Sequence, residues 1–320
     1  MTKDDSLSDG VRYSVVIPVY KNYASLALVV DRLEWLQTQL DGRLEAVFVV
    51  DGSPDESALL LRQLLSKSSL DSQLLSHSRN FGSFAAIRTG FLSGRGDYVA
   101  AMAADLQEPV ELVVQFFAEL VSGSYDIAIG TRVKREDPWV TRALSSAYWS
   151  MYRRWVQRDM PVGGVDIFAT TRQVARGFGS LNESNSSLVG LLFWLGYRRI
   201  EIPYSRSERV HGKSAWTFGK KLAYLLDSVF SFTSLPISAI LAVGLVGSAI
   251  ALIAAFVVFV TWIVGAIPVP GYAALMLVLL FATGSILFAL GIVGTYVWRT
   301  FENTKNRPGS IVMLHETFNG

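Results

Sequence analysis

The chain has 320 residues, which is enough for a sizeable core and more than one small domain needs. Its formal net charge is only +2, and no block of basic residues indicates a nucleic-acid partner. There is no cysteine, which excludes disulfides and thiolate chemistry. Residues 1–10 are polar and acidic and lack the apolar region of a signal peptide, so we expect this tail to precede a domain that stays in the cytosol.

Short apolar segments rich in β-branched residues alternate with helical patterns in the first two thirds of the chain. We predict strands at Val11–Tyr20, Leu44–Ser53, Gln73–His77, Asp97–Met102, Tyr125–Gly130 and Arg199–Tyr204, with a glycine-led strand or loop at Gly163–Ala169. We predict helices at Tyr23–Leu40, Ser57–Ser66, Ser83–Leu92, Trp139–Gln157 and Ser187–Leu195, and a further helix that Pro109 opens in its first turn. This order predicts an α/β domain over residues 11–214, with a mostly parallel sheet between flanking helices.

The last third of the chain contains a long uncharged stretch. Between Ser228 and Trp298 there is no Asp, Glu, Lys, Arg or His, whereas one transmembrane helix needs roughly 20 apolar residues. We therefore predict a transmembrane hairpin over residues 234–299, with spans at Leu235–Ala266 and Tyr272–Trp298 and a proline-rich turn between them. The alternative is a buried helical hairpin of a soluble protein, but soluble cores of that length break up into amphipathic pieces.

The segment before this hairpin, residues 215–233, mixes two lysines with aromatic and aliphatic side chains. This pattern suits an amphipathic helix in the membrane interface, although an ordinary core-packing helix has the same pattern. Basic residues flank the hairpin on both sides at Lys220, Lys221, Arg299, Lys305 and Arg307. By the positive-inside rule both flanks face the cytosol, so residues 300–320 are predicted to be a cytosolic C-terminal tail of a multi-pass protein.

Two acidic turns follow predicted strands, where parallel sheets bind ligands. Asp51, in Asp-Gly-Ser, offers hydrogen-bond acceptors for a uracil ring or a ribose, although a turn or N-cap aspartate has the same appearance. Asp105 and Gln107 lie two residues apart, so in an extended chain their oxygens point to one side. Such oxygens suit Mg²⁺ or Mn²⁺ shared with a substrate diphosphate, and a structural loop aspartate is the alternative.

Basic residues recur after the fifth strand. They are Arg132, Arg135, Arg142, Arg206, Arg209, His211 and Lys213. Arginine forks suit phosphate oxygens, while a solvated basic face would carry the same residues. Gly212 lets the backbone beside Lys213 approach an anion, and the segment precedes the predicted interfacial helix. A lipid phosphate is therefore a candidate ligand.

Together these segments resemble a known family. They read VVIPVYKN, VVDGSPDES, SRNFGSFAAIRTG, AADLQEP, YDIAIGTR, GGVDIF, NESNSSLVGLLFWLGY and RSERVHGKSAWTFGKK, followed by the two apolar stretches. The chain is similar to family 2, GT-A-type glycosyltransferases, and most similar to their polyprenyl-phosphate branch, the relatives of dolichol-phosphate mannose synthase. The resemblance runs from Val11 to about Val312, with the motifs in order and at the family spacing.

The resemblance implies a role for each matching residue. The residues that match the family's nucleotide-sugar site are Pro18, Tyr20, Asp51, Ser53, Arg79, Asn80, Gly82 and Asp105. Those that match its metal ligands are Asp105 and Gln107. Those that match its lipid-phosphate site are Arg132, Arg142, Arg206, Arg209 and Lys213. Asp166 stands where the family has an acidic residue near the reacting centre, so the implied catalytic set is Asp105, Asp166, Arg132 and Lys213.

The implied reaction is inverting transfer of a sugar from a nucleotide diphosphate-sugar, with UDP-sugar as the expected donor, to a polyprenyl phosphate at the cytoplasmic membrane face. The implied partners are that donor, that lipid, the membrane and further copies of the chain, as a tetramer. Small residues that allow close helix packing support the last point; they are Gly244, Gly247, Gly284, Gly291 and Gly294.

The sequence departs from the family pattern at three positions. Val50 and Ala103 replace the first acid of the uracil and metal motifs, and Thr295 stands where this branch often has a glutamate. These departures keep open a decayed, non-catalytic membrane scaffold. A processive polysaccharide synthase is a further alternative, but Met151 replaces the glutamine of its Gln-X-X-Arg-Trp motif, and two spans form no obvious pore.

Overall fold

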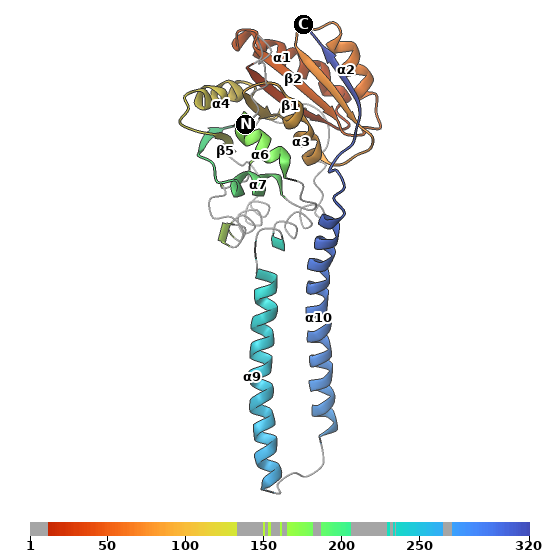
Figure 1. Cartoon of the computed structure of the whole chain (residues 1–320), viewed down its shortest axis with the longest axis vertical. Coiled ribbons are helices and arrows are strands. Elements are labelled where there is room, and N and C mark those ends of the chain that lie inside the picture. Colours follow the sequence, from red (N-terminus) through yellow and green to blue (C-terminus); the bar gives the residue numbers. More distant parts are fainter. Residues whose placement is uncertain are drawn as a thin grey trace.

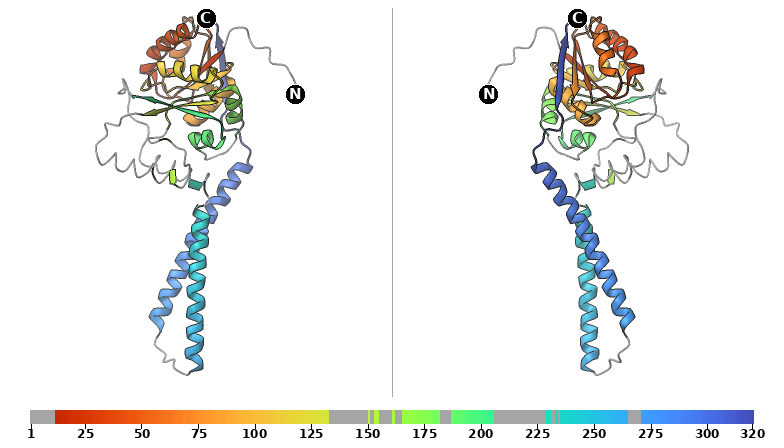
Figure 2. Two further views of the ribbon diagram at one scale, coloured as in Figure 1. Left: turned by 90° about the vertical axis from the view of Figure 1, so that its left-hand side faces the viewer. Right: turned by 90° about the vertical axis from the view of Figure 1, so that its right-hand side faces the viewer.

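The protein, described here by a computed structural model, consists of an α/β domain at one end of a long helical hairpin (Figures 1 and 2). The structure describes residues 12–132, 150, 153–154, 161, 165–181, 187–205, 229–230, 233, 235–264 and 271–320. The predicted helix at 139–157 and the predicted interfacial helix at 215–233 lie almost wholly outside these residues.

Among the described residues, one eight-stranded sheet forms the centre of the domain. Its strands are β1 (Tyr13–Val19), β2 (Leu44–Val50), β3 (Ser72–His77), β4 (Tyr98–Ala101), β5 (Ile127–Arg132), β6 (Phe168–Thr171), β7 (Arg199–Tyr204) and β8 (Val312–Phe318). Their spatial order is β7-β5-β6-β4-β1-β2-β3-β8. Only β6, against β4 and β5, and β8, against β3, run antiparallel. The predicted mostly parallel, GT-A-like sheet is confirmed.

Helices cover both faces of this sheet, as predicted. They are α1 (Leu26–Gln39, after a short 3-10 turn at Tyr23–Ser25), α2 (Ser57–Leu65), α3 (Ser83–Ser93), α4 (Glu111–Val121), α6 (Arg172–Ser180) and α7 (Leu188–Trp194). The period of two in β1 separates the two cores. Val15 and Ile17 pack in one core with Phe116 of α4, and Val16 packs in the other with Phe91 of α3.

The start of α4 differs from the prediction. Pro109 does not open the helix, which begins at Glu111. The carbonyls of Pro109 and Val110 instead accept hydrogen bonds from Leu112 and Val113, three residues on in each case. These two residues therefore form a tight turn that precedes the helix, a common arrangement at helix starts.

The prediction of a C-terminal tail at 300–320 is wrong for its last part. β8 pairs antiparallel with β3, from Ser72 opposite Phe318 to His77 opposite Val312. The Arg62 guanidinium of α2 donates to the Glu316 carboxylate: its Nε–H is shared between the two oxygens at 2.9 Å, and Nη2 donates to Oε2 at 2.8 Å. The chain thus returns from the hairpin to complete the sheet.

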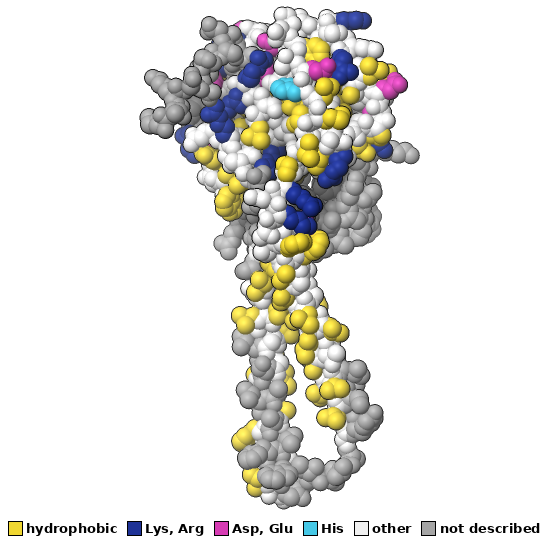
Figure 3. All heavy atoms as spheres, turned by 45° about the vertical axis from the view of Figure 1, so that its right-hand side comes forward, with side chains coloured by type: hydrophobic (Ala, Val, Ile, Leu, Met, Phe, Trp, Pro, Cys, Tyr) yellow, Lys and Arg dark blue, Asp and Glu magenta, His cyan; other side chains and the backbone are white. Residues whose placement is uncertain are grey.

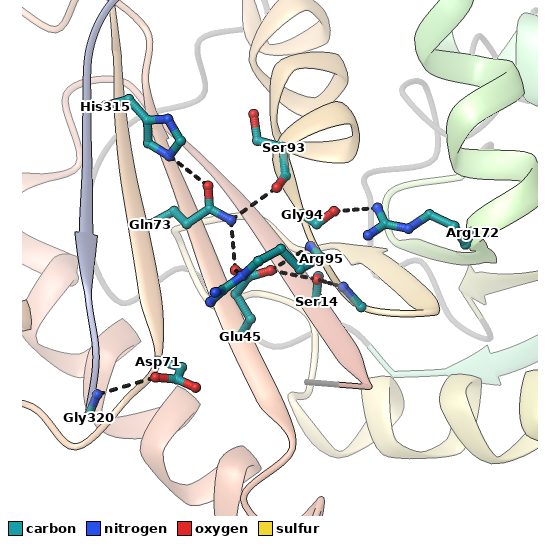
Figure 4. Close-up of polar contacts among 11 residues, drawn as sticks. Ser14, Glu45, Asp71, Gln73, Ser93, Gly94, Arg95, Arg172, His315 and Gly320 are labelled. Carbon is teal, nitrogen blue, oxygen red and sulfur yellow. Dashed lines mark hydrogen bonds and ion pairs between the residues drawn. The ribbon is translucent and has the colours of Figure 1, made fainter. Parts of the chain in front are cut away.

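His315 of β8, which is exposed, also joins β8 to a network of buried polar side chains. Figure 4 shows His315 of β8 against Gln73 of β3, with Nε2 2.8 Å from Oε1. The Gln73 amide nitrogen donates to Oε1 of Glu45 at 2.7 Å, and the Ser14 hydroxyl donates to its Oε2 at 2.9 Å. Glu45 has no exposed surface, and Arg95 forms its ion pair. This network lies at the amino ends of β1, β2 and β3.

The hairpin consists of α9 (Leu235–Ile263) and α10 (Tyr272–Thr304). Apolar side chains point outward along both helices (Figure 3), for example Ile250 and Phe288, which are 63% and 64% exposed. Among the described residues, one segment, Ala282–Thr304, is long and apolar enough to cross a membrane by length and composition. Lys and Arg side chains gather where the hairpin meets the domain (Figure 3).

Candidate active site

One edge of the sheet carries most of the predicted site residues. Because β1–β5 and β7 run the same way, their carboxyl ends lie at one edge, together with the start of β6 and of β8. Along the strand order this edge presents Tyr204, Arg132, Asp166, Asp105, Pro18, Asp51 and His77. β8 begins eight residues after α10 ends, so the same edge faces the hairpin (Figure 1).

The loops after β1, β2 and β3 interlock. The Ser53 hydroxyl donates to Asp55 at 2.6 Å and accepts the backbone N–H of Lys21 at 2.8 Å. Gly52 has φ +57°, and a Cβ there would collide with the backbone of Arg79 and Asn80, so only glycine fits this approach. The predicted nucleotide residues of the three loops therefore lie together, with Tyr20 41% exposed beside them.

Asp51 is buried beneath these loops and accepts hydrogen bonds from the loop after β3. Its side chain is only 2% exposed, and Oδ1 accepts hydrogen bonds from the His77 ring at 2.8 Å and from the Phe81 N–H at 2.8 Å. Oδ2 accepts the Gly82 N–H at 2.7 Å. Burial alone would raise the pKa of Asp51, but these hydrogen bonds outweigh it and lower the pKa. The predicted nucleotide contact of Asp51 stays a prediction, and its visible role is to fold the loop after β3.

Asp51→Asn is expected to destabilise the domain by about 2 kcal/mol at neutral pH, because the Asn amide nitrogen would face a backbone N–H donor. A carboxyl group with a lowered pKa stabilises the fold above its unfolded pKa, about 3.9, and loses that contribution as pH falls through the folded pKa. The Tm difference between wild type and variant should therefore hold from pH 7 to 5 and shrink below about pH 4. Thermal unfolding across pH tests this, and a constant difference down to pH 2.5 would contradict it.

The loop after β3, residues 78–82, displays two predicted donor-binding side chains. Arg79 and Asn80 are exposed, and the Arg79 guanidinium lies 4.1 Å from the centre of the Phe81 ring, a cation–π contact. Gly82, with φ +98°, ends the loop and caps α3. The loop thus presents a cation and an amide on a fixed backbone.

The loop after β4 corrects one prediction. Leu106 has φ +51°, so Asp105-Leu106-Gln107 is not extended, and the argument that both oxygens point to one side is wrong. Gln107 and Glu108 are buried, at 7% and 2% exposure. The described residues contain no group of three or more His, Cys, Asp or Glu that could hold a metal. An Asp105 carboxylate still fits a Mg²⁺-type ion, because such ions are usually held by one or two carboxylates together with substrate phosphates and water.

Arg132, Asp166 and Tyr204 form a cluster at the other end of the edge. Arg132 and Tyr204 are register partners at the ends of β5 and β7, and Asp166 precedes β6. Arg132 Nε forms an ion pair with Asp166 Oδ2, and the Tyr204 hydroxyl donates to the same oxygen at 3.0 Å. Among the described residues, no hydrogen bond reaches Oδ1 of Asp166, whose side chain is 27% exposed. Oδ2 therefore binds both neighbouring side chains, and part of the Asp166 carboxylate is exposed.

The electrostatics of this cluster link it to the loop after β4. Burial raises the pKa of Tyr204, and the charges of Asp166 and Glu108 raise it further, so the phenol stays a hydrogen-bond donor. Burial would lower the pKa of Arg132, but Asp166 and Tyr204 outweigh it and raise the pKa. Arg132 is therefore a fixed cation of this cluster, and Tyr204 is the member that interacts with Glu108 of the loop after β4.

Several predicted site residues cannot be placed at this edge of the sheet. Arg142, Arg206, Arg209 and Lys213 lie outside the described residues. Val50, the first departure from the family pattern, is only 3% exposed and packs in the core of the domain, so an acid there would replace a core contact. Tyr204 and His77 of this edge are not among the residues predicted from the sequence. Both end predicted strands, and a polar ring at the carboxyl end of a predicted strand was the available signal.

Comparison with known proteins decides the family. Residues 14–178 match the model of glycosyl transferase family 2. The matched segment contains the loops after β1–β4 and extends past Asp166. The chain belongs to glycosyl transferase family 2. This family 2 glycosyltransferase is 32% identical over 302 residues to an uncharacterised glycosyltransferase of Synechocystis sp., covering 93% of each chain.

Two further relatives of this family 2 glycosyltransferase carry more specific names. The undecaprenyl-phosphate 4-deoxy-4-formamido-L-arabinose transferase of Proteus mirabilis is 30% identical over 302 residues, covering 93% of this chain and 91% of its own. The bactoprenol glucosyl transferase of Shigella flexneri is 26% identical over 303 residues, covering 94% and 97%. The likeness thus extends over the hairpin as well as the domain.

Proposed function

We propose that this family 2 glycosyltransferase moves a sugar from a nucleotide diphosphate-sugar, expected to be a UDP-sugar, to a polyprenyl phosphate with inversion. The observation that carries the proposal is one sheet edge that faces the hairpin and holds both the donor loops and the cation Arg132. The relatives named for undecaprenyl phosphate and bactoprenol support the lipid acceptor.

The donor side is assigned to the loops after β1–β4. Pro18, Tyr20, Asp51, Ser53, Arg79, Asn80 and Gly82 are proposed to form the nucleotide site. Asp105, with Gln107 as the second predicted ligand, would hold Mg²⁺ or Mn²⁺. When bound, such an ion neutralises the charge of the departing nucleoside diphosphate.

The acceptor side is assigned to the cluster at the ends of β5 and β7. A phosphate monoester has a second pKa near 6, so a lipid phosphate is largely ionised at neutral pH and needs no strong base. Arg132 would hold that phosphate, with Arg142, Arg206, Arg209 and Lys213 as further ligands. Asp166, which is partly exposed beside Arg132, would orient the acceptor or the sugar hydroxyls rather than remove a proton.

The hairpin is proposed to place this edge at the cytoplasmic headgroup level. α9 and α10 would both span the membrane, with residues 11–214 and both termini in the cytosol and residues 215–233 in the interface. The groove between α9 and α10 nearest the domain would take the start of the polyprenyl chain, because it is lined by apolar residues including Ile237, Leu241, Val293, Val297 and Phe301. Confinement to one surface raises the effective concentration of the acceptor.

Further copies of the chain are expected as partners, as a tetramer by resemblance. A Cβ at any of Gly244, Gly247, Gly284, Gly291 or Gly294 would meet open space in the single chain. Helix surfaces of this kind allow close approach of another helix in a membrane.

The proposal is tested by transfer of radiolabelled sugar into butanol-extractable lipid, with purified protein, polyprenyl phosphate and a panel of nucleotide sugars. We expect label in the lipid with one donor and its loss with EDTA, restored by Mg²⁺ or Mn²⁺. No label with any donor would favour the decayed scaffold that Val50 and Ala103 suggest. Label in a water-soluble polymer would favour a processive synthase.

A further inference from the structure

A chain of hydrogen bonds joins the segment after α10 to the loop at residues 78–82. The Ser310 hydroxyl lies 2.8 Å from the Thr89 hydroxyl of α3, and Thr89 Oγ1 lies 2.9 Å from His77 Nε2. His77 Nδ1 lies 2.8 Å from Asp51 Oδ1. Ser310 is thus the distal end of a path that reaches a carboxylate inside the donor region.

The inner members of this path are shielded from water. His77 and Asp51 are each 2% exposed, and Thr89 is 7% exposed. An ionised carboxylate only accepts hydrogen bonds, so Nδ1–H of His77 donates to Asp51. For the neutral ring Nε2 then accepts from Thr89, and Thr89 accepts from Ser310. Each side chain is held by the next, and a buried network of this kind fixes its members in one geometry.

Both sides of the loop depend on this path and on the same C-terminal segment. Asp51 accepts the N–H groups of Phe81 and Gly82 at one end of the loop. At the other end, the Ser78 N–H donates to the Ile311 carbonyl at 3.0 Å. The His77 ring also meets Phe81 edge-on, with ring centres 5.6 Å apart. The exposed Arg79 and Asn80 therefore stand on a backbone that is tied at both ends.

We propose that His77, Thr89 and Ser310 are positioning residues for the nucleotide-sugar donor, and that the segment joining α10 to β8 is part of the donor site. They act through Asp51 and the loop at 78–82 and touch neither substrate. The inference rests on the proposed function only in naming the ligand as a nucleotide sugar. It gives the C-terminal segment a role in donor binding as well as in completing the sheet.

Thr89→Val tests the path with little change of shape, since it replaces a hydroxyl by a methyl group. Thr89→Ser is the conservative rescue, because it keeps the hydroxyl, and Ser310→Ala removes the outermost group. Glu316→Gln is the matched control: it weakens another contact of the C-terminal segment, that with Arg62 of α2, away from the loop. Each full-length variant is purified in lipid nanodiscs beside the wild type.

The first readout needs no activity. Hydrogen–deuterium exchange of the Phe81 and Gly82 amides should quicken about fivefold in Thr89→Val and Ser310→Ala, and remain at the wild-type rate in Thr89→Ser and Glu316→Gln. The second readout is kinetic. The KM for the nucleotide sugar should rise about fivefold in the first two variants, with the KM for polyprenyl phosphate and kcat little changed.

The outcomes separate the two proposals. Unchanged exchange at Phe81 and Gly82 in Thr89→Val would overturn the positioning role whatever the activity. Equal changes in Glu316→Gln would overturn it too, because the effect would then follow from general loosening of β8. A wild type that transfers no sugar, with the predicted exchange pattern intact, would overturn the proposed reaction and leave the coupling of Ser310 to the loop.

Discussion

Asp105→Asn is expected to lower kcat/KM for sugar transfer by about 10²–10³-fold, the usual effect of losing one group that stabilises developing charge in a transition state. The substitution keeps the shape of the side chain and removes its negative charge. Asp105 would be the only carboxylate of the proposed metal pair, since Gln107 is neutral. An amide oxygen is a much weaker ligand for a hard cation, so the variant should also need a higher metal concentration for half-maximal activity.

The measurement is initial-rate transfer across a titration of Mn²⁺ and of Mg²⁺. Asp126→Asn is the matched control, because Asp126 lies at the amino end of β5, on the opposite edge of the sheet, where it pairs with Arg198 at 2.9 Å. The control should keep near wild-type kcat/KM and metal dependence. If Asp105→Asn retained full metal-dependent transfer, the assignment of Asp105 would be wrong and the loop after β4 would be structural.

Much of the domain could be predicted because its signals are local. β2 reads LEAVFVV and every one of its residues is buried, the pattern of a strand covered on both faces. β8 gives no such signal. It reads VMLHETF with a mostly exposed pattern, and what holds it is the ladder with β3 and the contacts of His315 and Glu316. Those partners lie more than 230 positions earlier, so no local pattern contains them.

The candidate site shows the same division. That Asp51 and Asp105 lie at strand ends follows from the alternation of strands and helices, which places ligand-binding residues at one edge. Their exact roles depend on the conformation of single residues. The φ of +51° at Leu106 and the turn of the Phe81 and Gly82 amides toward Asp51 are set by tertiary packing. The sequence at Leu106, Phe81 and Asp51 does not indicate the positive φ or the direction of these amides.

Asp166→Ala is expected to lower kcat/KM for the lipid acceptor by about 10²-fold, since a small misplacement of a positioning group can cost that much. The substitution leaves Arg132 without its ion-pair partner and the Tyr204 hydroxyl without its acceptor. Both groups are then free to turn away from the acceptor phosphate. Tyr204→Phe removes one hydrogen bond and keeps the ion pair, so it should cost only about fivefold. The donor KM should change little in either variant.

The pH profile of Asp166→Asn decides between orientation and base catalysis. If Asp166 only orients the acceptor, the acid limb of kcat/KM reports the second ionisation of the lipid phosphate, near pH 6, and it should remain at the same pH in the variant. If Asp166 were the base, its ionisation would set that limb, and the limb would disappear with the carboxylate. Asp166 already accepts hydrogen bonds from a cation and a phenol on Oδ2, and these contacts hold the carboxylate in one orientation. A lipid phosphate that is already ionised needs no base, so we expect the limb to persist while the rate falls.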